Sequence, residues 1–206
     1  LMGVFGVARS ALREALRILE SEGLVTVLRG RHGGPRVTRP TVEHIARMFA
    51  LLLQMEGVPM NDLYAARAAI EPWLARMFAE NHTPEALADF RAAVDAAAAA
   101  AHAEDGAAFG DAAALVHDKL FEHAGNASMA LFARLLSEVV SEFYRRSGQV
   151  AGSTERKRAV RSYRKFCRLV EARDADAAEA HWRLQMSHTA KAFLEHPVEL
   201  FPEPGR

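Results

Sequence analysis

Apolar residues recur with a helical period along most of the chain. Near the start, four of them lie at i, i+3, i+4 and i+7, which places them on one helix face. They are Leu12, Ala15, Leu16 and Leu19. After Pro40 the same pattern predicts seven helices, because Pro, Gly and Asp residues stand at or near the breaks between apolar stretches. The predicted helices are 41–57, 60–80, 83–104, 107–124, 127–148, 153–172 and 175–194.

A short β-hairpin is predicted between the first helix and the rest. Gly23 ends the helix, residues 25–28 have strand character, residues 29–34 form a turn rich in Gly and Arg, and residues 36–38 return as a second strand. A helix followed by such a hairpin is the second half of a winged helix-turn-helix. Residues 1–7 resemble the end of an element, so we expect this unit to be incomplete at its start.

The predicted fold is therefore mostly α. An N-terminal winged helix-turn-helix over residues 1–40 is followed by an all-α antiparallel helical bundle over residues 41–195 and an extended tail over residues 196–206. Pro72 lies inside one predicted helix, where we expect a kink or a break near Glu71.

Composition narrows the class of protein. Cys167 is the single cysteine, which excludes an internal disulfide and a multi-cysteine zinc site. The longest apolar run, residues 48–53, is too short to span a bilayer, and no signal pattern opens the chain, so we expect a soluble cytoplasmic protein. Lys and Arg balance Asp and Glu at 26 each, but residues 1–40 hold seven Arg against three Glu, a net +4. This asymmetry indicates nucleic-acid binding.

Two stretches of sequence resemble known families. Residues 5–25, FGVARSALREALRILESEGLV, resemble the recognition-helix signature of GntR-superfamily transcriptional regulators. The helical remainder, up to about Glu195, resembles the FadR subfamily with its FCD ligand-binding domain. The matching motifs are Asp62-Leu63-Tyr64, Arg67, Glu71-Pro72, Ala124-Gly125-Asn126 and Ala172-Arg173-Asp174-Ala175.

The resemblance implies a DNA-binding surface. Arg9 and Arg13 would contact bases or phosphates and Ser10 a phosphate, while Arg29, Gly30 and Arg31 would form the tip of the wing. Ala8 stands where the family has Ser or Thr, and losing that helix cap costs about 1 kcal/mol. A chain that lacks the upstream helix is expected to bind DNA poorly or not at all.

The resemblance also implies an effector pocket in the bundle. Many FCD domains bind a divalent metal through an Asp and three His. The family spacing places Ala113, His117, Tyr163 and Gln185 at those four positions, so we expect the metal site to be lost and no cofactor to be needed. The alternative is a rebuilt site in which His181 or His188 joins His117.

Helical periodicity independently places Arg67, His117 and Tyr163 on apolar helix faces. A buried Arg requires an anionic partner, which is either Glu71, one turn away, or a ligand carboxylate or phosphate. With Ala113 and Gln185, these residues form the predicted pocket, for a small organic anion such as a carboxylate or a fatty acyl derivative. The plain alternative for His117 is a hydrogen-bonded core histidine.

The leading hypothesis is a ligand-responsive transcriptional regulator, a repressor, that binds a palindromic operator as a homodimer. The alternatives are a metal-binding regulator of this family and a stand-alone small-molecule binding protein. A metal-dependent helical enzyme is disfavoured, because none of the nine His has a Glu three residues before it, and we expect no enzyme. Trp73 and Trp182 are expected to be core or interface anchors, and His82, His102 and His123 to lie on the surface.

Overall fold

A computed structural model describes residues 2–30, 33–148 and 150–194, with side chains as far as Thr189. The chain forms two compact units, Leu1–Met48 and Phe49–Arg206, and each is described by itself. This division falls inside a helix, and the predicted boundary at residue 40 stays a prediction. The predicted tail lies outside the described residues.

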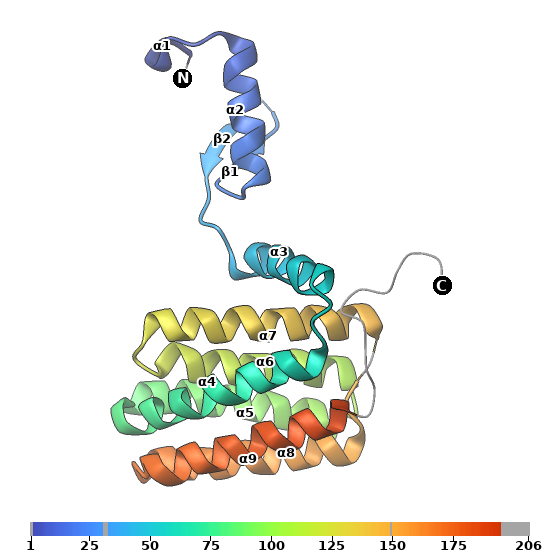
Figure 1. The fold of residues 1–206 in the computed structure, drawn as a ribbon. Helices are drawn as coiled ribbons and strands as arrows, with labels where there is room; N and C mark the ends of the chain where they lie inside the picture. The colour runs from blue at the N-terminus through green and yellow to red at the C-terminus, as the bar shows by residue number, and fades with distance from the viewer. Residues whose placement is uncertain (1, 31–32, 149, 195–206) are drawn as a thin grey trace. The chain divides into compact units, whose positions relative to one another are not determined.

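The first unit contains a helix followed by a hairpin, as predicted. Its elements are α1 (Met2–Phe5), α2 (Arg9–Ser21), β1 (Val25–Leu28) and β2 (Gly34–Val37). The two strands pair antiparallel, with Val25 opposite Val37 and Leu28 opposite Gly34 (Figure 1).

Gly23 ends α2 in the way that its sequence position predicts. Its φ of 69° is left-handed, and the Leu24 amide donates to the Leu19 carbonyl at 2.9 Å. This is the Schellman motif. The residue just after the helix adopts a left-handed conformation, which glycine adopts easily because it has no Cβ. The Thr38 hydroxyl donates to the Gly23 carbonyl at 2.8 Å, and the Glu20 carboxylate accepts from the Val27 amide at 3.1 Å. These bonds attach the hairpin to the end of α2.

The remaining elements are all helices, and each begins and ends within two residues of its predicted bounds. They are α3 (Val42–Met55), α4 (Met60–Asn81), α5 (Pro84–His102), α6 (Gly106–His123), α7 (Ala127–Ser147), α8 (Ser153–Glu171) and α9 (Ala175–Leu194). Of the kink or break predicted near Glu71, the break is absent because α4 runs through Pro72 without interruption, and the kink stays a prediction. Pro72 is buried, and proline removes one backbone donor from the helix.

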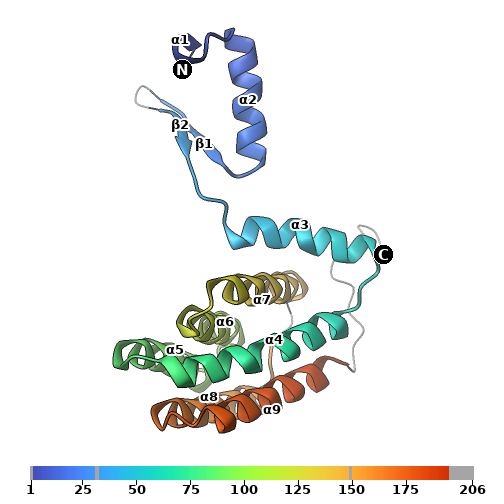
Figure 2. The same cartoon turned by 60° about the vertical axis from the view of Figure 1, so that its left-hand side comes forward.

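Helices α4–α9 form an antiparallel bundle in which α4 lies between α7 and α9 in both views (Figures 1 and 2). Side chains at the helix starts accept backbone N–H bonds and define the turns. Thr83 caps α5, Asp105 caps α6 and Asn126 caps α7. At the turn between α8 and α9, the Arg173 guanidinium donates to the carbonyls of Glu80 and His82 at 2.8 and 3.0 Å, which ties this turn to the end of α4.

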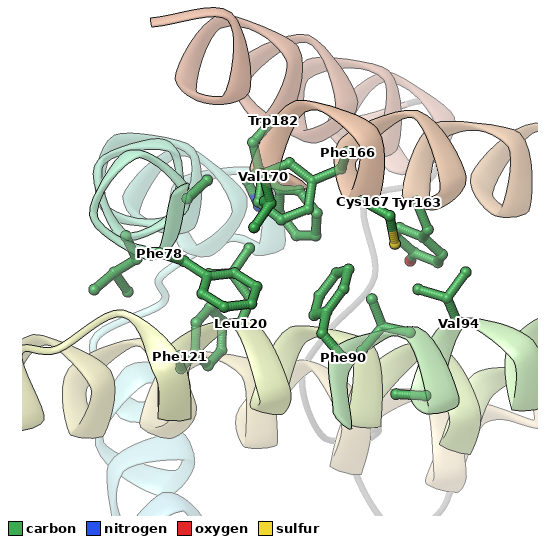
Figure 3. Close-up of a cluster of buried hydrophobic side chains, with 14 of the residues drawn as sticks. Phe78, Phe90, Val94, Leu120, Phe121, Tyr163, Phe166, Cys167, Val170 and Trp182 are labelled. Atoms are coloured by element: carbon green, nitrogen blue, oxygen red, sulfur yellow. The ribbon is translucent and has the colours of Figure 1, made fainter. Parts of the chain in front are cut away.

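The core of the bundle is aromatic (Figure 3). Phe78, Phe90, Phe166 and Trp182 are fully buried and their rings contact one another in a chain from α4 and α5 to α8 and α9. Cys167 is also buried, and burial raises the pKa of its thiol to about 11. Among the described residues, no helix combines the length and the hydropathy that crossing a membrane requires.

Candidate effector site and DNA-binding surface

The first turn of α2 presents the predicted DNA-contacting side chains. Arg9, Ser10 and Arg13 are exposed, and Arg13 lies one helical turn after Arg9. Among the described residues neither Arg forms an ion pair, whereas Arg17 lies 3.9 Å from Glu14. Two unpaired guanidinium groups on one face match the charge pattern of DNA backbones and guanine edges.

Ala8 occupies the N-cap position of α2 and makes no side-chain hydrogen bond there. The uncapped amides of the first turn therefore point away from the helix without a side-chain acceptor. A phosphate can satisfy such amides, so the missing cap is compatible with DNA binding.

The hairpin tip brings Arg29 and Gly30 to the end of β1. Both are exposed, and Gly30 has a φ of 110°, a conformation that favours glycine. The Gly33 amide donates to the Gly30 carbonyl at 3.0 Å and closes the turn. Arg31, the third predicted residue of the tip, lies outside the described residues.

Inside the bundle, Glu71 of α4 is the centre of a polar network. Its side chain is fully buried, and both carboxylate oxygens accept hydrogen bonds. Oε1 accepts from Arg67 Nε at 2.7 Å. Oε2 accepts from Trp182 Nε1 at 3.0 Å and lies 2.8 Å from His117 Nδ1. One carboxylate thus links α4 to α6 and α9.

The charges of this network are balanced within the chain. Burial alone would raise the pKa of Glu71, but Arg67 and then His117 outweigh burial and bring it down to about 2. Burial likewise opposes the charge on Arg67, and Glu71 overcomes it and raises the Arg67 pKa. The sequence left two partners open for Arg67, and in the structure its partner is Glu71. The expectation of an anionic effector depended on the other possible partner of Arg67, a carboxylate or phosphate of the ligand.

Of the predicted pocket residues, Arg67 and His117 belong to this network, and Tyr163 lies beside His117. The His117 ring lies 6.2 Å from the ring of Tyr163 and 5.1 Å from that of Trp182, centre to centre. Tyr163 and Gln185 are buried, and Ala113, one turn before His117 on α6, is partly buried against the core. His117 thus faces Tyr163 and Trp182 in the bundle interior, as its position on an apolar face predicts.

Two tyrosines beside the network were not predicted. The Tyr64 and Tyr144 hydroxyls lie 2.7 Å apart and join α4 to α7, and the Arg67 guanidinium lies 5.8 Å from the centre of the Tyr64 ring. Burial raises the pKa of both phenols, that of Tyr64 to about 12. Periodicity places Tyr64 on the buried face of α4, but no sequence signal pairs it with a residue 80 positions away.

The histidines outside the network have other partners. His181 Nε2 lies 2.9 Å from the Ser162 carbonyl, and burial lowers the pKa of this imidazole. The surface position expected for His82 was wrong: it is buried, and Nδ1 lies 3.2 Å from the Ala79 carbonyl. His123 is partly buried, stacks on Phe78 and bonds to Asp89.

One group in the described part of the chain brings three metal-type ligand atoms close together. It consists of Asp89, Glu122 and His123. Lys119 already contacts the two carboxylates at 2.8 and 3.0 Å, so its ammonium offsets one of their two negative charges. This group does not include His117, His181 or His188.

Comparison with known proteins identifies the helical unit. A family model described as "FCD domain" matches residues 62–188, which is more than half of the chain. This span covers the whole Glu71 network and most of the α4–α9 bundle. A comparison with curated protein sequences gave no match.

Solved structures show that the fold extends over both units. A Streptococcus agalactiae GntR protein has a TM-score of 0.69 at 17% identity, covering 92% of this chain and 85% of its own. The E. coli protein McbR/YncC has a TM-score of 0.60 at 13% identity, covering 94% and 84%. A putative GntR regulator from Rhodococcus sp. RHA1 has a TM-score of 0.54 at 18% identity, covering 96% and 85%. At these identities, the likeness establishes a shared fold.

Proposed function

This chain belongs to the FCD domain family, and on that premise we propose that it is a ligand-responsive transcriptional regulator of the GntR type. The proposal is a cytoplasmic repressor that binds a palindromic operator as a homodimer and releases it when an organic effector enters the bundle. Two-fold symmetry of the protein would match two half-sites of the operator.

The observation that carries the proposal is the exposed first turn of α2. Arg9 and Arg13 stand on one face beside uncapped backbone amides, and a hairpin with Arg29 at its tip follows the same helix. A helix N-terminus with Arg residues suits the major groove, and a Gly-rich Arg tip suits the backbone or the minor groove. This combination of features is typical of a DNA-binding helix and wing, and it is not expected on a surface without a binding function.

We further propose that the effector site lies beside His117 and works without a resident metal. The family's metal site needs carboxylate and imidazole ligands, and Ala113, Tyr163 and Gln185 supply neither. Glu71, the buried carboxylate nearby, already accepts three hydrogen bonds. The residues present do not fit a divalent ion.

Selection of duplexes from random-sequence DNA tests the DNA-binding part, at low salt because phosphate contacts weaken steeply with salt. We expect the wild-type chain to enrich a palindrome with half-site centres about 10 base pairs apart. The Arg9→Ala, Arg13→Ala double variant is expected to enrich nothing while its circular dichroism stays unchanged.

A matched control removes two exposed Arg residues from the bundle instead. Arg158 and Arg161 of α8 are both exposed, so Arg158→Ala, Arg161→Ala changes the net charge by the same amount. This control should select the same palindrome as the wild type. Equal loss in both double variants would indicate non-specific charge attraction instead of DNA recognition by α2.

A further inference from the structure

The hydrogen bonds around Glu71 determine which nitrogen of His117 carries a proton. Nδ1 lies 2.8 Å from Glu71 Oε2 and 3.3 Å from Arg67 Nη2. An ionised carboxylate only accepts, so Nδ1 must donate its N–H to Glu71. In the neutral imidazole, the other nitrogen, Nε2, then has a lone pair and accepts hydrogen bonds.

Two further polar groups near His117 have no hydrogen-bond partner. Among the residues that the structure describes, these are the Tyr163 hydroxyl and the Gln185 side-chain amide, on residues that are 3% and 8% exposed. Gln185 follows Trp182 by three positions and therefore lies on the same side of α9. Buried polar groups normally have partners, so groups without one indicate a missing ligand or water.

The unpartnered groups beside His117 are not completely enclosed by protein. In the described part of the chain, the fully enclosed side-chain nitrogens without a partner are Nε of Arg134 and of Arg156. The Tyr163 hydroxyl and the Gln185 amide are not fully enclosed in this way, so each borders space at least the size of a water molecule. The His117 side chain is itself 12% exposed although Glu71, its bonding partner, is fully buried.

The charge of the site opposes an anionic ligand. Arg67 and Glu71 neutralise each other at 2.7 Å, so this guanidinium is not free to pair with a ligand anion. A carboxylate entering this site would find Arg67 already paired with Glu71, and transfer of an unpaired charge from water is costly. Rings of Phe121, Tyr163 and Trp182 surround His117 and favour a flat apolar body.

We propose that the effector is an uncharged organic molecule with a flat apolar part and at least one N–H or O–H group that donates to His117 Nε2. The inference rests on the function proposed above, because it specifies the ligand class of the same site. The Tyr163 hydroxyl and the Gln185 amide bind the remaining polar atoms of the ligand. Glu71 acts as a positioning residue that holds the imidazole in the accepting tautomer.

Benzamide and benzoate form a matched pair of probes, since they share size and shape but differ in charge and in N–H donors. Trp182 reports binding by its fluorescence in a Trp73→Phe background, where it is the single tryptophan of the chain. We expect benzamide to bind with a Kd at least about tenfold below that of benzoate, a difference that one unbalanced charge readily produces.

Two hydroxyl deletions localise the binding. Tyr163→Phe removes a hydroxyl without a protein partner and keeps the ring, so it should weaken benzamide several-fold without altering the unfolding midpoint. Tyr64→Phe removes a hydroxyl that is bonded to Tyr144 and should leave benzamide affinity unchanged. Equal effects of the two variants would contradict the assignment of Tyr163 to the site.

The outcomes separate this inference from the proposed function. Tighter binding of benzoate would overturn the uncharged class and leave the effector site in place. Binding of neither probe at millimolar concentration would overturn the site itself, whereas DNA selection would still test the regulator. Stoichiometric retention of a divalent metal that is lost in His117→Phe would overturn both the uncharged class and the metal-free proposal.

Discussion

Glu71 is the residue on which the interior of the bundle depends most. It is fully buried, pairs with Arg67 on its own helix and accepts hydrogen bonds from Trp182 and His117 on two others. The cost of burying two charges is offset only because every oxygen of this carboxylate has a partner. Removing one charge of such a buried ion pair leaves the opposite charge buried without a partner.

We expect Glu71→Gln to lower the free energy of unfolding by about 3 kcal/mol, since Arg67 would then be a buried unpaired cation. Urea unfolding followed by circular dichroism measures this change. Glu80→Gln is the matched control, because the exposed Arg76–Glu80 pair at 2.9 Å should contribute less than about 1 kcal/mol.

The double variant Arg67→Met, Glu71→Gln separates the lost pair from simple loss of packing. With both charges removed, no uncompensated ion remains, and stability should return to within about 1 kcal/mol of the wild type. If the double variant is no more stable than Glu71→Gln alone, the account of a charge-balanced pair is incorrect.

The same residue gives the bundle a defined acid sensitivity. Its pKa falls from 4.5 to about 2 on folding, so the folded state favours the ionised form. The stability it contributes is present above pH 4.5 and is lost as the pH falls through about 2. Urea midpoints measured between pH 5 and pH 2 should drop more steeply in the wild type than in Glu71→Gln, and parallel profiles would contradict this assignment.

At the scale of elements, helical periodicity and turn residues were sufficient to predict nearly every helix. Caps at Thr83, Asp105 and Asn126 and the left-handed Gly23 are local signals, readable without tertiary structure. Pro72 does not interrupt α4, although its ring and its missing N–H disfavour a helix interior. The Tyr64–Tyr144 contact was not predictable, because it depends on how α4 and α7 pack.

The candidate site was partly predictable for a similar reason. Apolar faces placed Arg67, His117 and Tyr163 inside the bundle, and spacing gave Glu71 as one possible partner. Periodicity does not show which of two partners a buried Arg uses, nor that Trp182 donates to the same carboxylate. Those facts follow from three helices meeting at one point.

The uncapped start of α2 offers a prediction at this scale. Ala8→Ser places an acceptor next to the first amides and should stabilise α2 by about 1 kcal/mol, seen as slower hydrogen exchange of its amides. Ala11→Ser, three positions later on the exposed helix, adds the same hydroxyl where it cannot cap and should not slow exchange. Equal effects would show that Ala8 does not limit the helix.

At the scale of the molecule, our proposal assigns DNA binding to the first unit and effector binding to the second. The first carries exposed Arg side chains, and the second carries a buried polar network beside an open imidazole. An effector regulates DNA binding only if it has different affinities for the DNA-competent and DNA-incompetent arrangements. By linkage, an operator must then change effector affinity by the same factor as the effector changes operator affinity.

Native mass spectrometry of the chain mixed with its selected duplex tests the central claim most directly. We predict two chains on one duplex, without a divalent metal, and no such complex for Arg9→Ala, Arg13→Ala. The duplex with one chain, or with two chains of the double variant as readily as of the wild type, would contradict a dimeric regulator that reads DNA with α2.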